Sequence, residues 1–146
     1  MPPLTRQELD HFLATGARLL RLATLAEDGW PYVNPVWYHY EGGFLYVAGR
    51  QQARWVGHLR RDPRVCGTID TDAPPYVRVQ VLGTAVVEDE AWLGDWEAWA
   101  VRYLGPEEGR RYYQQTREIP RVLVRIEPRR ITSWAGPGWH PRYLRG

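Results

Sequence analysis

The arginines where a predicted strand meets a predicted helix are the residues with the clearest chemistry. Arg50 and Arg54 flank Gln51-Gln52-Ala53, directly after Gly49. Free backbone N–H groups and the helix dipole favour an anion at a helix start, and two guanidinium groups would add to that preference. We therefore expect either a phosphate-binding clamp or a pair of solvated surface arginines at this position.

The other residue types that commonly carry catalysis offer little. The chain has no lysine, one serine (Ser133) and one cysteine (Cys66), and its four histidines match no short metal-binding spacing. These counts exclude a lysine Schiff base, a lysine-armed phosphate loop, a thiolate zinc cluster and an intrachain disulfide. Cys66 lies within an apolar run and is interpreted as a small core residue. No metal site is predicted, and no catalytic residue can be named.

Length and composition indicate one compact domain spanning residues 1–146. The chain is 44% hydrophobic and 25% charged, which is an ordinary ratio for a globular protein. Its formal net charge of +2 argues against nucleic acid as a partner. We expect no membrane span and no signal peptide, because no apolar segment is long enough, and we expect a cytoplasmic protein.

Hydrophobic periodicity predicts a mainly β protein, an antiparallel β-barrel with peripheral helices. Thr5 and Glu8 fit a capping box at the start of the first helix. Six or seven short strands arrive mainly in hairpin order, which favours an antiparallel barrel over a parallel sheet. Strands are predicted at residues 18–26, 32–40, 44–48, 64–70, 77–87, 121–127 and 131–134, with Pro128 interrupting the last two. Helices are predicted within residues 4–17, 53–61, 89–103 and 107–116, the last two forming a helical insertion near 89–116.

A stripe of aromatic residues follows the predicted helix 89–103. Trp92, Trp96, Trp99 and Tyr103 recur at helical spacing. Such a stripe is typical of core or dimer packing, and it could also form a lid over an aromatic substrate.

Several short motifs follow one another along most of the chain. They are residues 21–25 (RLATL), Asp28-Gly29, residues 31–38 (PYVNPVWY), 59–65 (LRRDPRV), 77–85 (VRVQVLGTA) and 127–134 (EPRRITSW). In this order and spacing they resemble the pyridoxamine 5'-phosphate oxidase-like family of split β-barrels, which bind FMN or the deazaflavin F420.

The resemblance implies a homodimer with a cofactor in each of two clefts between the subunits. The cofactor ring would lie along the second strand, beside Asn34, Pro35, Val36, Trp37 and Tyr38, although Val36 and Trp37 could equally be core residues. Family members bind the cofactor phosphate with the segment after the third strand, which here contains Gly49, Arg50 and Arg54.

Two further residues align with family positions near the ring. Arg78 stands where some members have a glutamine that reaches the ring, and Trp134 aligns with a closing tryptophan. Arg78 could instead face solvent, and Trp134 could be a core residue. Many members also have a lysine where this chain has Trp55, so either Arg50 replaces that charge or the cofactor is F420 instead of FMN.

The resemblance implies an FMN- or F420-dependent oxidoreductase that acts on an unidentified small molecule. The alternative is a non-catalytic protein that binds flavin, F420 or haem, with His39 or His58 as a haem ligand. A third hypothesis is a dimeric protein without a cofactor. The tail residues His140, Arg142 and Arg145 do not match the pattern with which the oxidase itself binds its substrate.

Overall fold

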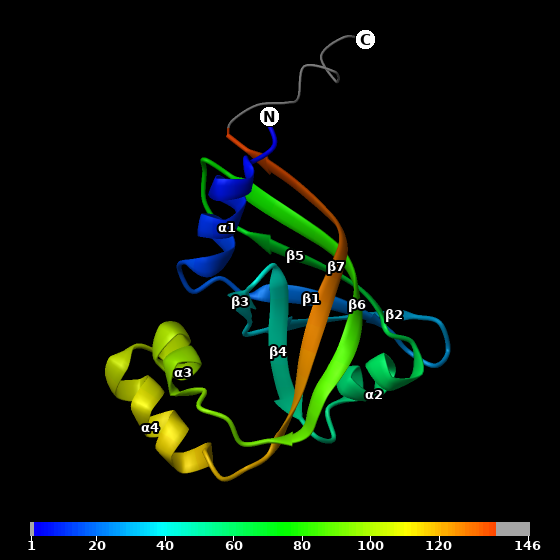
Figure 1. Ribbon diagram of the computed structural model, residues 1–146, viewed down its shortest axis with the longest axis vertical. Helices are drawn as coiled ribbons and strands as arrows, with labels where there is room; N and C mark the ends of the chain where they lie inside the picture. The colour runs from blue at the N-terminus through cyan, green and yellow to red at the C-terminus, as the bar shows by residue number, and fades with distance from the viewer. Residues whose placement is uncertain (1, 137–146) are drawn as a thin grey trace.

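Within the described residues 2–136, the computed structural model forms a single seven-stranded antiparallel sheet with four helices around it (Figure 1). In chain order the elements are α1 (Arg6–Ala14), β1 (Leu20–Leu25), β2 (Pro31–Val36), β3 (His39–Glu41), β4 (Phe44–Arg50), α2 (Arg54–Arg61), β5 (Arg64–Asp70), β6 (Val77–Trp92), α3 (Glu97–Leu104), α4 (Pro106–Thr116) and β7 (Arg121–Ala135). The tail residues His140, Arg142 and Arg145 lie outside the described residues.

The order of the strands explains why the sheet curls into a barrel. Across the sheet the strands run β2-β1-β5-β6-β7-β4-β3, so β2 and β3 are its two edges. Only Trp37 and Tyr38 separate the end of β2 from the start of β3. The sheet must therefore curve until its edges approach each other, and the gap beside β2 is where the candidate site lies.

The core lies inside this barrel. Strand residues alternate between faces, and the inward positions carry aliphatic side chains such as Leu22 on β1, Val47 on β4 and Val124 on β7, all nearly inaccessible to solvent. Helix α1 adds Leu13 to the same core. Tyr38 is also fully buried, and its hydroxyl donates a hydrogen bond to the Leu13 carbonyl at 2.8 Å. Burial of these side chains is the main stabilising term.

Several elements confirm the sequence predictions. Thr5 and Glu8 form the predicted capping box at the start of α1, with both reciprocal hydrogen bonds present. β1 and β2 form the predicted antiparallel hairpin, and β5 spans the predicted residues 64–70.

The predicted helix 89–103 is wrong in its first half. β6 continues to Trp92 because Asp89 and Trp92 pair with Leu123 and Arg121 of β7, and helix α3 begins only at Glu97. Cross-strand hydrogen bonding thus overrides the helical spacing of the tryptophans. The change moves Trp92 from a helix face onto the sheet.

Pro128 does not interrupt the last strand as predicted. β7 is continuous from Arg121 to Ala135, and the register shifts by one residue where Pro128 lies opposite Gly83. Such a bulge accommodates a residue that lacks an N–H donor. A Cβ at Gly83 would lie 2.7 Å from the Glu127 carbonyl oxygen, so this close approach requires glycine.

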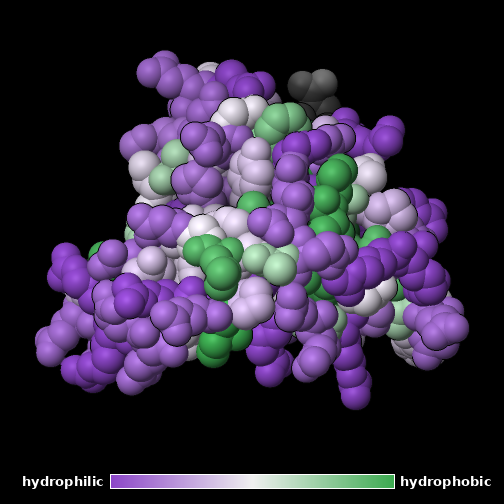
Figure 2. All heavy atoms as spheres, turned by 60° about the horizontal axis from the view of Figure 1, so that its bottom comes forward, coloured by the Kyte–Doolittle hydropathy of each residue, from purple (hydrophilic) through white to green (hydrophobic). Residues whose placement is uncertain are grey.

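The surface is largely hydrophilic on the side turned forward in Figure 2, where hydrophobic residues form separated patches. None of the helices in residues 2–136 is long and apolar enough to cross a membrane.

Candidate functional site

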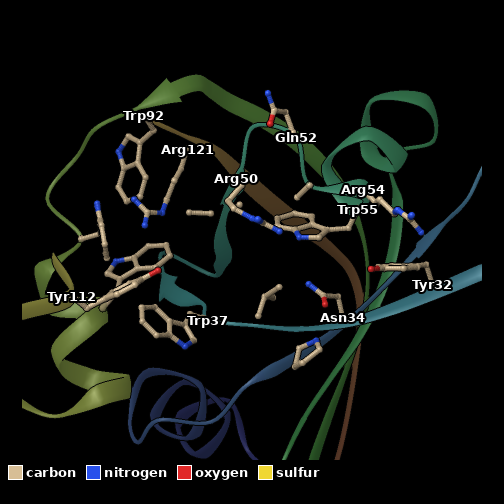
Figure 3. Close-up of a pocket in the computed structure, with 17 residues that line it drawn as sticks. Tyr32, Asn34, Trp37, Arg50, Gln52, Arg54, Trp55, Trp92, Tyr112 and Arg121 are labelled. Atoms are coloured by element: carbon tan, nitrogen blue, oxygen red, sulfur yellow. The ribbon is translucent and has the colours of Figure 1, made fainter. Parts of the chain in front are cut away.

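A cleft of about 600 Å³ opens beside β2 and β4 (Figure 3). Its volume is in the range of small-molecule sites. Three parts of the chain form its walls: β2, the β4–α2 junction, and the segment that runs from the end of β6 through α3 and α4 to the start of β7. The lining residues are Tyr32, Asn34, Pro35, Val36, Trp37, Ala48, Gly49, Arg50, Gln52, Ala53, Arg54, Trp55, Trp92, Trp96, Trp99, Tyr112 and Arg121.

The charges in this cleft are all positive. Arg50, Arg54 and Arg121 line it, and no aspartate or glutamate does. In the part of the chain that the structure describes, none of the three forms an ion pair, whereas Arg60 and Arg125 do so with Glu90 and Glu88. A cleft with three uncompensated guanidinium groups favours an anionic ligand.

Strand register brings two of these arginines together. Arg50 at the end of β4 is the direct partner of Arg121 at the start of β7, and Arg121 is in turn the partner of Trp92 on β6. Residues directly opposite in an antiparallel pair share one face of the sheet. The two cations therefore project into the cleft from neighbouring strands, with Trp92 beside them.

The end of the cleft beside α2 combines backbone donors with Arg54. Helix α2 has Ala53 at its N-cap, so no side chain caps its first turn, and that turn holds no acidic residue. An uncapped helix start without acidic residues favours an anion.

Trp55 in the same turn has a packing role. Its ring is buried and lies against Gly49, where a Cβ would overlap it. The ring thus fills the position beside the strand end and adds an apolar wall, while the positive charge comes from Arg50 and Arg54.

We call the opposite end of the cleft the aromatic end and define it by Trp92, Trp96, Trp99, Tyr112 and Arg121. The guanidinium of Arg121 lies 3.9 Å from the centre of the Trp96 ring, and Trp96 is only 3% exposed. Trp92 and Trp99 have ring centres 5.6 Å apart. Figure 3 shows Arg121 beside Trp92, at the far side of the cleft from Arg54 and Tyr32.

Helix α3 is tied to the barrel by Tyr103, the last member of the aromatic stripe. Its hydroxyl donates to the Arg18 carbonyl at 2.8 Å and accepts from the Tyr38 backbone N–H at 3.1 Å. Its ring stacks on Trp37 with ring centres 5.0 Å apart. Burial raises the pKa of Tyr103 further above neutral pH, which is consistent with a hydroxyl that donates a hydrogen bond.

Most of the residues predicted for the site lie in the cleft. Asn34, Pro35 and Val36 line it from β2, and Trp37 lines it from the β2–β3 connection. Gly49, Arg50 and Arg54 line it from the β4–α2 junction.

The structure leaves three predicted residues outside the cleft. Tyr38 points into the core. Arg78 and Trp134 pair across β6 and β7 near the other end of these strands, with the guanidinium 4.7 Å from the centre of the Trp134 ring.

Sequence reasoning missed Arg121 and Tyr112. Arg121 is the first residue of a predicted strand, and nothing local distinguishes it from other arginines in the chain. Its place in the site is evident only from the pairing of β7 with β4, which sets Arg121 opposite Arg50. The tryptophan stripe was interpreted first as core or dimer packing and second as a lid, and Trp92, Trp96 and Trp99 line the cleft.

The two histidines considered as haem ligands lie elsewhere. His58 shares a 2.9 Å hydrogen bond with the hydroxyl of Thr24, and His39 packs on Trp99 and approaches Glu41. Neither lines the cleft, and the described residues contain no cluster of three side chains suited to hold a metal ion.

Comparisons with known proteins identify one family model and several solved structures with the same fold. A family model described as pyridoxamine 5'-phosphate oxidase matches residues 5–135. No curated protein matches the chain. The solved structure of a conserved hypothetical protein from Mycobacterium tuberculosis is 29% identical, with a TM-score of 0.72 over 94% of this chain and 91% of that chain.

Two further solved structures share the fold. An FAD-binding protein from Mesorhizobium loti is 24% identical, with a TM-score of 0.65 over 90% of this chain and 93% of that one. An F420 reductase is 23% identical, with a TM-score of 0.64 over 82% of this chain and 92% of that one. Because the family model covers nearly the whole described chain and the seven-stranded barrel matches these structures, the chain belongs to the pyridoxamine 5'-phosphate oxidase-like family of split β-barrels.

Proposed function

We propose that the cleft binds a flavin-type cofactor, FMN or F420, and that the protein is an oxidoreductase acting on a small molecule. The observation that carries this proposal is the charge of the cleft: three arginines without carboxylate partners in the described chain, among aromatic walls. Both cofactors are flat aromatic rings with an anionic tail, so this lining matches their chemistry. The names of related structures, an FAD-binding protein and an F420 reductase, support the same class.

The residues on either side of the β4–α2 junction would hold the cofactor. Arg50 and Arg54, with the uncapped start of α2, would bind its phosphate. Asn34, Pro35 and Val36 on β2, with Trp37 directly after it, would flank the ring with backbone polar groups and an apolar wall. When bound, the ring supplies the chemistry by accepting or donating a hydride or electrons. The protein then needs only to orient the ring and the substrate and to exclude water.

Trp55 is relevant to the choice between the two cofactors. It stands where many family members have a lysine, and it brings apolar surface without charge. FMN would depend on Arg50 for the missing charge. F420 has a longer acidic tail, which would also favour a cleft lined by arginines.

A homodimer is part of the proposal. Trp30 and Val33, at the edge strand next to the cleft, are 73% and 64% exposed, which favours a covering partner. Arg78 and Trp134 lie outside the cleft of their own chain, so in this proposal only a second copy could bring them to a cofactor. Sedimentation at micromolar concentration is expected to give a dimer, and a monomer there would contradict this part of the proposal.

Localisation in the cytoplasm is also proposed. The single cysteine, Cys66, allows no intrachain disulfide, which agrees with a reducing compartment. Cell fractionation with an antibody to the protein tests it.

The proposed cofactor is tested by titrating the purified protein with FMN and with F420 and monitoring binding by the fluorescence of each cofactor. The double variant Arg50→Ala, Arg54→Ala should bind about a hundredfold more weakly, because two charge-assisted contacts are lost. Arg117→Ala, Arg130→Ala removes the same charge from exposed positions outside the cleft and is the matched control. Equal cofactor affinity in the double variant and in the control would contradict the assignment of Arg50 and Arg54 as a phosphate clamp.

Turnover separates the oxidoreductase from a non-catalytic binding protein. A bound cofactor that NAD(P)H or reduced F420 reduces, and that a substrate reoxidises, supports the enzyme. A bound cofactor that undergoes neither step favours storage or sensing. A Soret band without flavin or F420 binding would favour haem, and binding of none of the three would end the cofactor proposal.

A further inference from the structure

The two ends of the cleft differ in chemistry, and the proposed function uses only one of them. Arg54, Trp55 and Tyr32 lie at the α2 end, while Arg121 and Trp92 lie across the cleft from them (Figure 3). We propose that the aromatic end binds the substrate, and that this substrate is a flat aromatic carboxylate whose anionic group contacts Arg121. This inference rests on the proposed function, since it assigns the α2 end to the cofactor.

Arg121 is held in a way that leaves donors free for a ligand. The ring of Trp96 covers one face of its guanidinium at 3.9 Å, and Trp96 is in turn packed edge-on against Tyr112 and Tyr113. Only Nη1 donates hydrogen bonds within the described chain, to the carbonyls of Ile119 at 3.3 Å and Thr116 at 3.5 Å. Nε and Nη2 therefore retain donors, and their fork matches the two oxygens of a carboxylate.

The absence of a carboxylate from the protein itself strengthens this assignment. The residues that line the cleft include no aspartate or glutamate, and Arg121 makes no ion pair in residues 2–136. Arg125, four residues further along β7 on the same face of the strand, is instead paired with Glu88 and Glu127. The chain thus neutralises the second of these arginines and leaves the first available to an external anion.

The surrounding rings indicate that the rest of the substrate is flat and aromatic. Trp92 and Trp99 are half-buried, and Tyr112 is 37% exposed, so part of each ring faces the cleft. The planes of Trp92 and Trp99 are tilted by 46°, and Trp37 meets Tyr112 edge-on at 5.8 Å. These half-open aromatic surfaces favour stacking or edge contacts with another ring.

A single arginine, Arg121, belongs to this end alone, which favours a singly charged group such as a carboxylate over a phosphate. Arg50 lies between the two ends, opposite Arg121 in the sheet. With Arg50 and Arg54 assigned to the cofactor phosphate, Arg121 is the one cleft arginine left for the substrate.

The experiment uses 2-naphthoate as the probe and 2-naphthamide as its neutral match. Both are titrated into the full chain, with and without saturating FMN, and binding is followed by calorimetry. We expect 2-naphthoate to bind at least about tenfold more tightly than 2-naphthamide, because only the anion can form a charge-assisted pair with Arg121. Equal affinity for the two probes would overturn the proposal.

Variants at Arg121 test the residue directly. Arg121→Gln should remove the preference for the anion, Arg121→Lys should retain part of it, and Arg117→Gln, an exposed change of equal charge, should leave it intact. Trp99→Leu should weaken both probes equally, since it removes ring surface and no charge. If Arg121→Gln fails to fold, the other two variants still test the proposal. Arg121→Lys should reduce the preference for 2-naphthoate over 2-naphthamide, whereas Trp99→Leu should leave that preference unchanged.

The same variants separate failure of this inference from failure of the proposed function. Arg121→Gln should change FMN affinity less than twofold, whereas Arg50→Ala, Arg54→Ala should lose FMN and keep 2-naphthoate. If Arg121→Gln loses FMN and keeps 2-naphthoate, Arg121 belongs to the cofactor and the inference is wrong. If the wild-type chain binds 2-naphthoate with the expected preference and no flavin or F420, the aromatic end stands and the cofactor proposal fails.

Discussion

Arg50 and Arg121 lie directly opposite each other on β4 and β7, and both line the cleft. Like charges in this position repel, and no carboxylate of the described chain pairs with either residue. An anion bound between or beside them relieves the repulsion. We therefore expect this arrangement to be unfavourable in the free protein and to become favourable when an anion binds.

A double-mutant cycle between Arg50→Gln and Arg121→Gln should measure this repulsion. We expect an unfavourable coupling of about 0.5 kcal/mol in the unfolding free energy of the free protein at low salt. The coupling should fall in 1 M salt, which screens charges over a few ångströms. Urea unfolding followed by circular dichroism measures it, and a favourable or salt-independent coupling would contradict the interpretation.

Gly49→Ala should destabilise the protein by about 1–3 kcal/mol, because the added methyl group overlaps the buried ring of Trp55. Gly57→Ala is the matched control. It lies in the same region, in helix α2, with no neighbour within 4 Å of its new Cβ, and should stabilise by about 0.5–1 kcal/mol through helix propensity. Thermal and urea unfolding distinguish the two, and equal effects would contradict the packing of Trp55 on Gly49.

Tyr103→Phe should lower the free energy of unfolding by about 1–3 kcal/mol, because it leaves the Arg18 carbonyl and the Tyr38 N–H without their hydrogen-bond partner. It should also speed hydrogen exchange in α3, which the hydroxyl links to the segment before β1 and to the β2–β3 connection. Tyr113→Phe removes a hydroxyl that forms no hydrogen bond within the described residues, so its unfolding free energy should match wild type. A Tyr103 variant as stable as the Tyr113 variant would show that the link is unimportant.

The contact between Tyr40 and Asp10 should make stability depend on alkaline pH. Burial and the hydrogen bond to the Asp10 carboxylate raise the pKa of Tyr40 to about 12. A tyrosine whose pKa is raised in the folded state stabilises the protein fully below the unfolded value, about 10, and loses that contribution as pH rises through the folded value. Wild type should therefore lose more stability between pH 10 and pH 12 than Tyr40→Phe. If the unfolding free energies of wild type and Tyr40→Phe fall in parallel between pH 10 and pH 12, the predicted role of the Tyr40–Asp10 contact is wrong.

Much of the fold follows from local patterns in the sequence. Alternation of apolar and polar residues located most of β6 and the first half of β7, and Thr5 with Glu8 located the start of α1. These signals are local because they depend on side chains a few residues apart. The prediction failed at residues 89–92, where tryptophans at helical spacing belong to a strand that pairs with β7.

The candidate site divides in the same way. Composition and short spacing are enough to establish that the chain has no lysine, that Arg50 and Arg54 stand at a strand-to-helix junction, and that tryptophans cluster near residue 96, because these features need no partner strand. The position of Arg121 opposite Arg50 and beside Trp92, and the position of Arg78 and Trp134 away from the cleft, follow from the folded sheet alone. Strand pairing between distant segments sets these neighbours, and it depends on how the whole sheet buries its inner face, which no local pattern encodes.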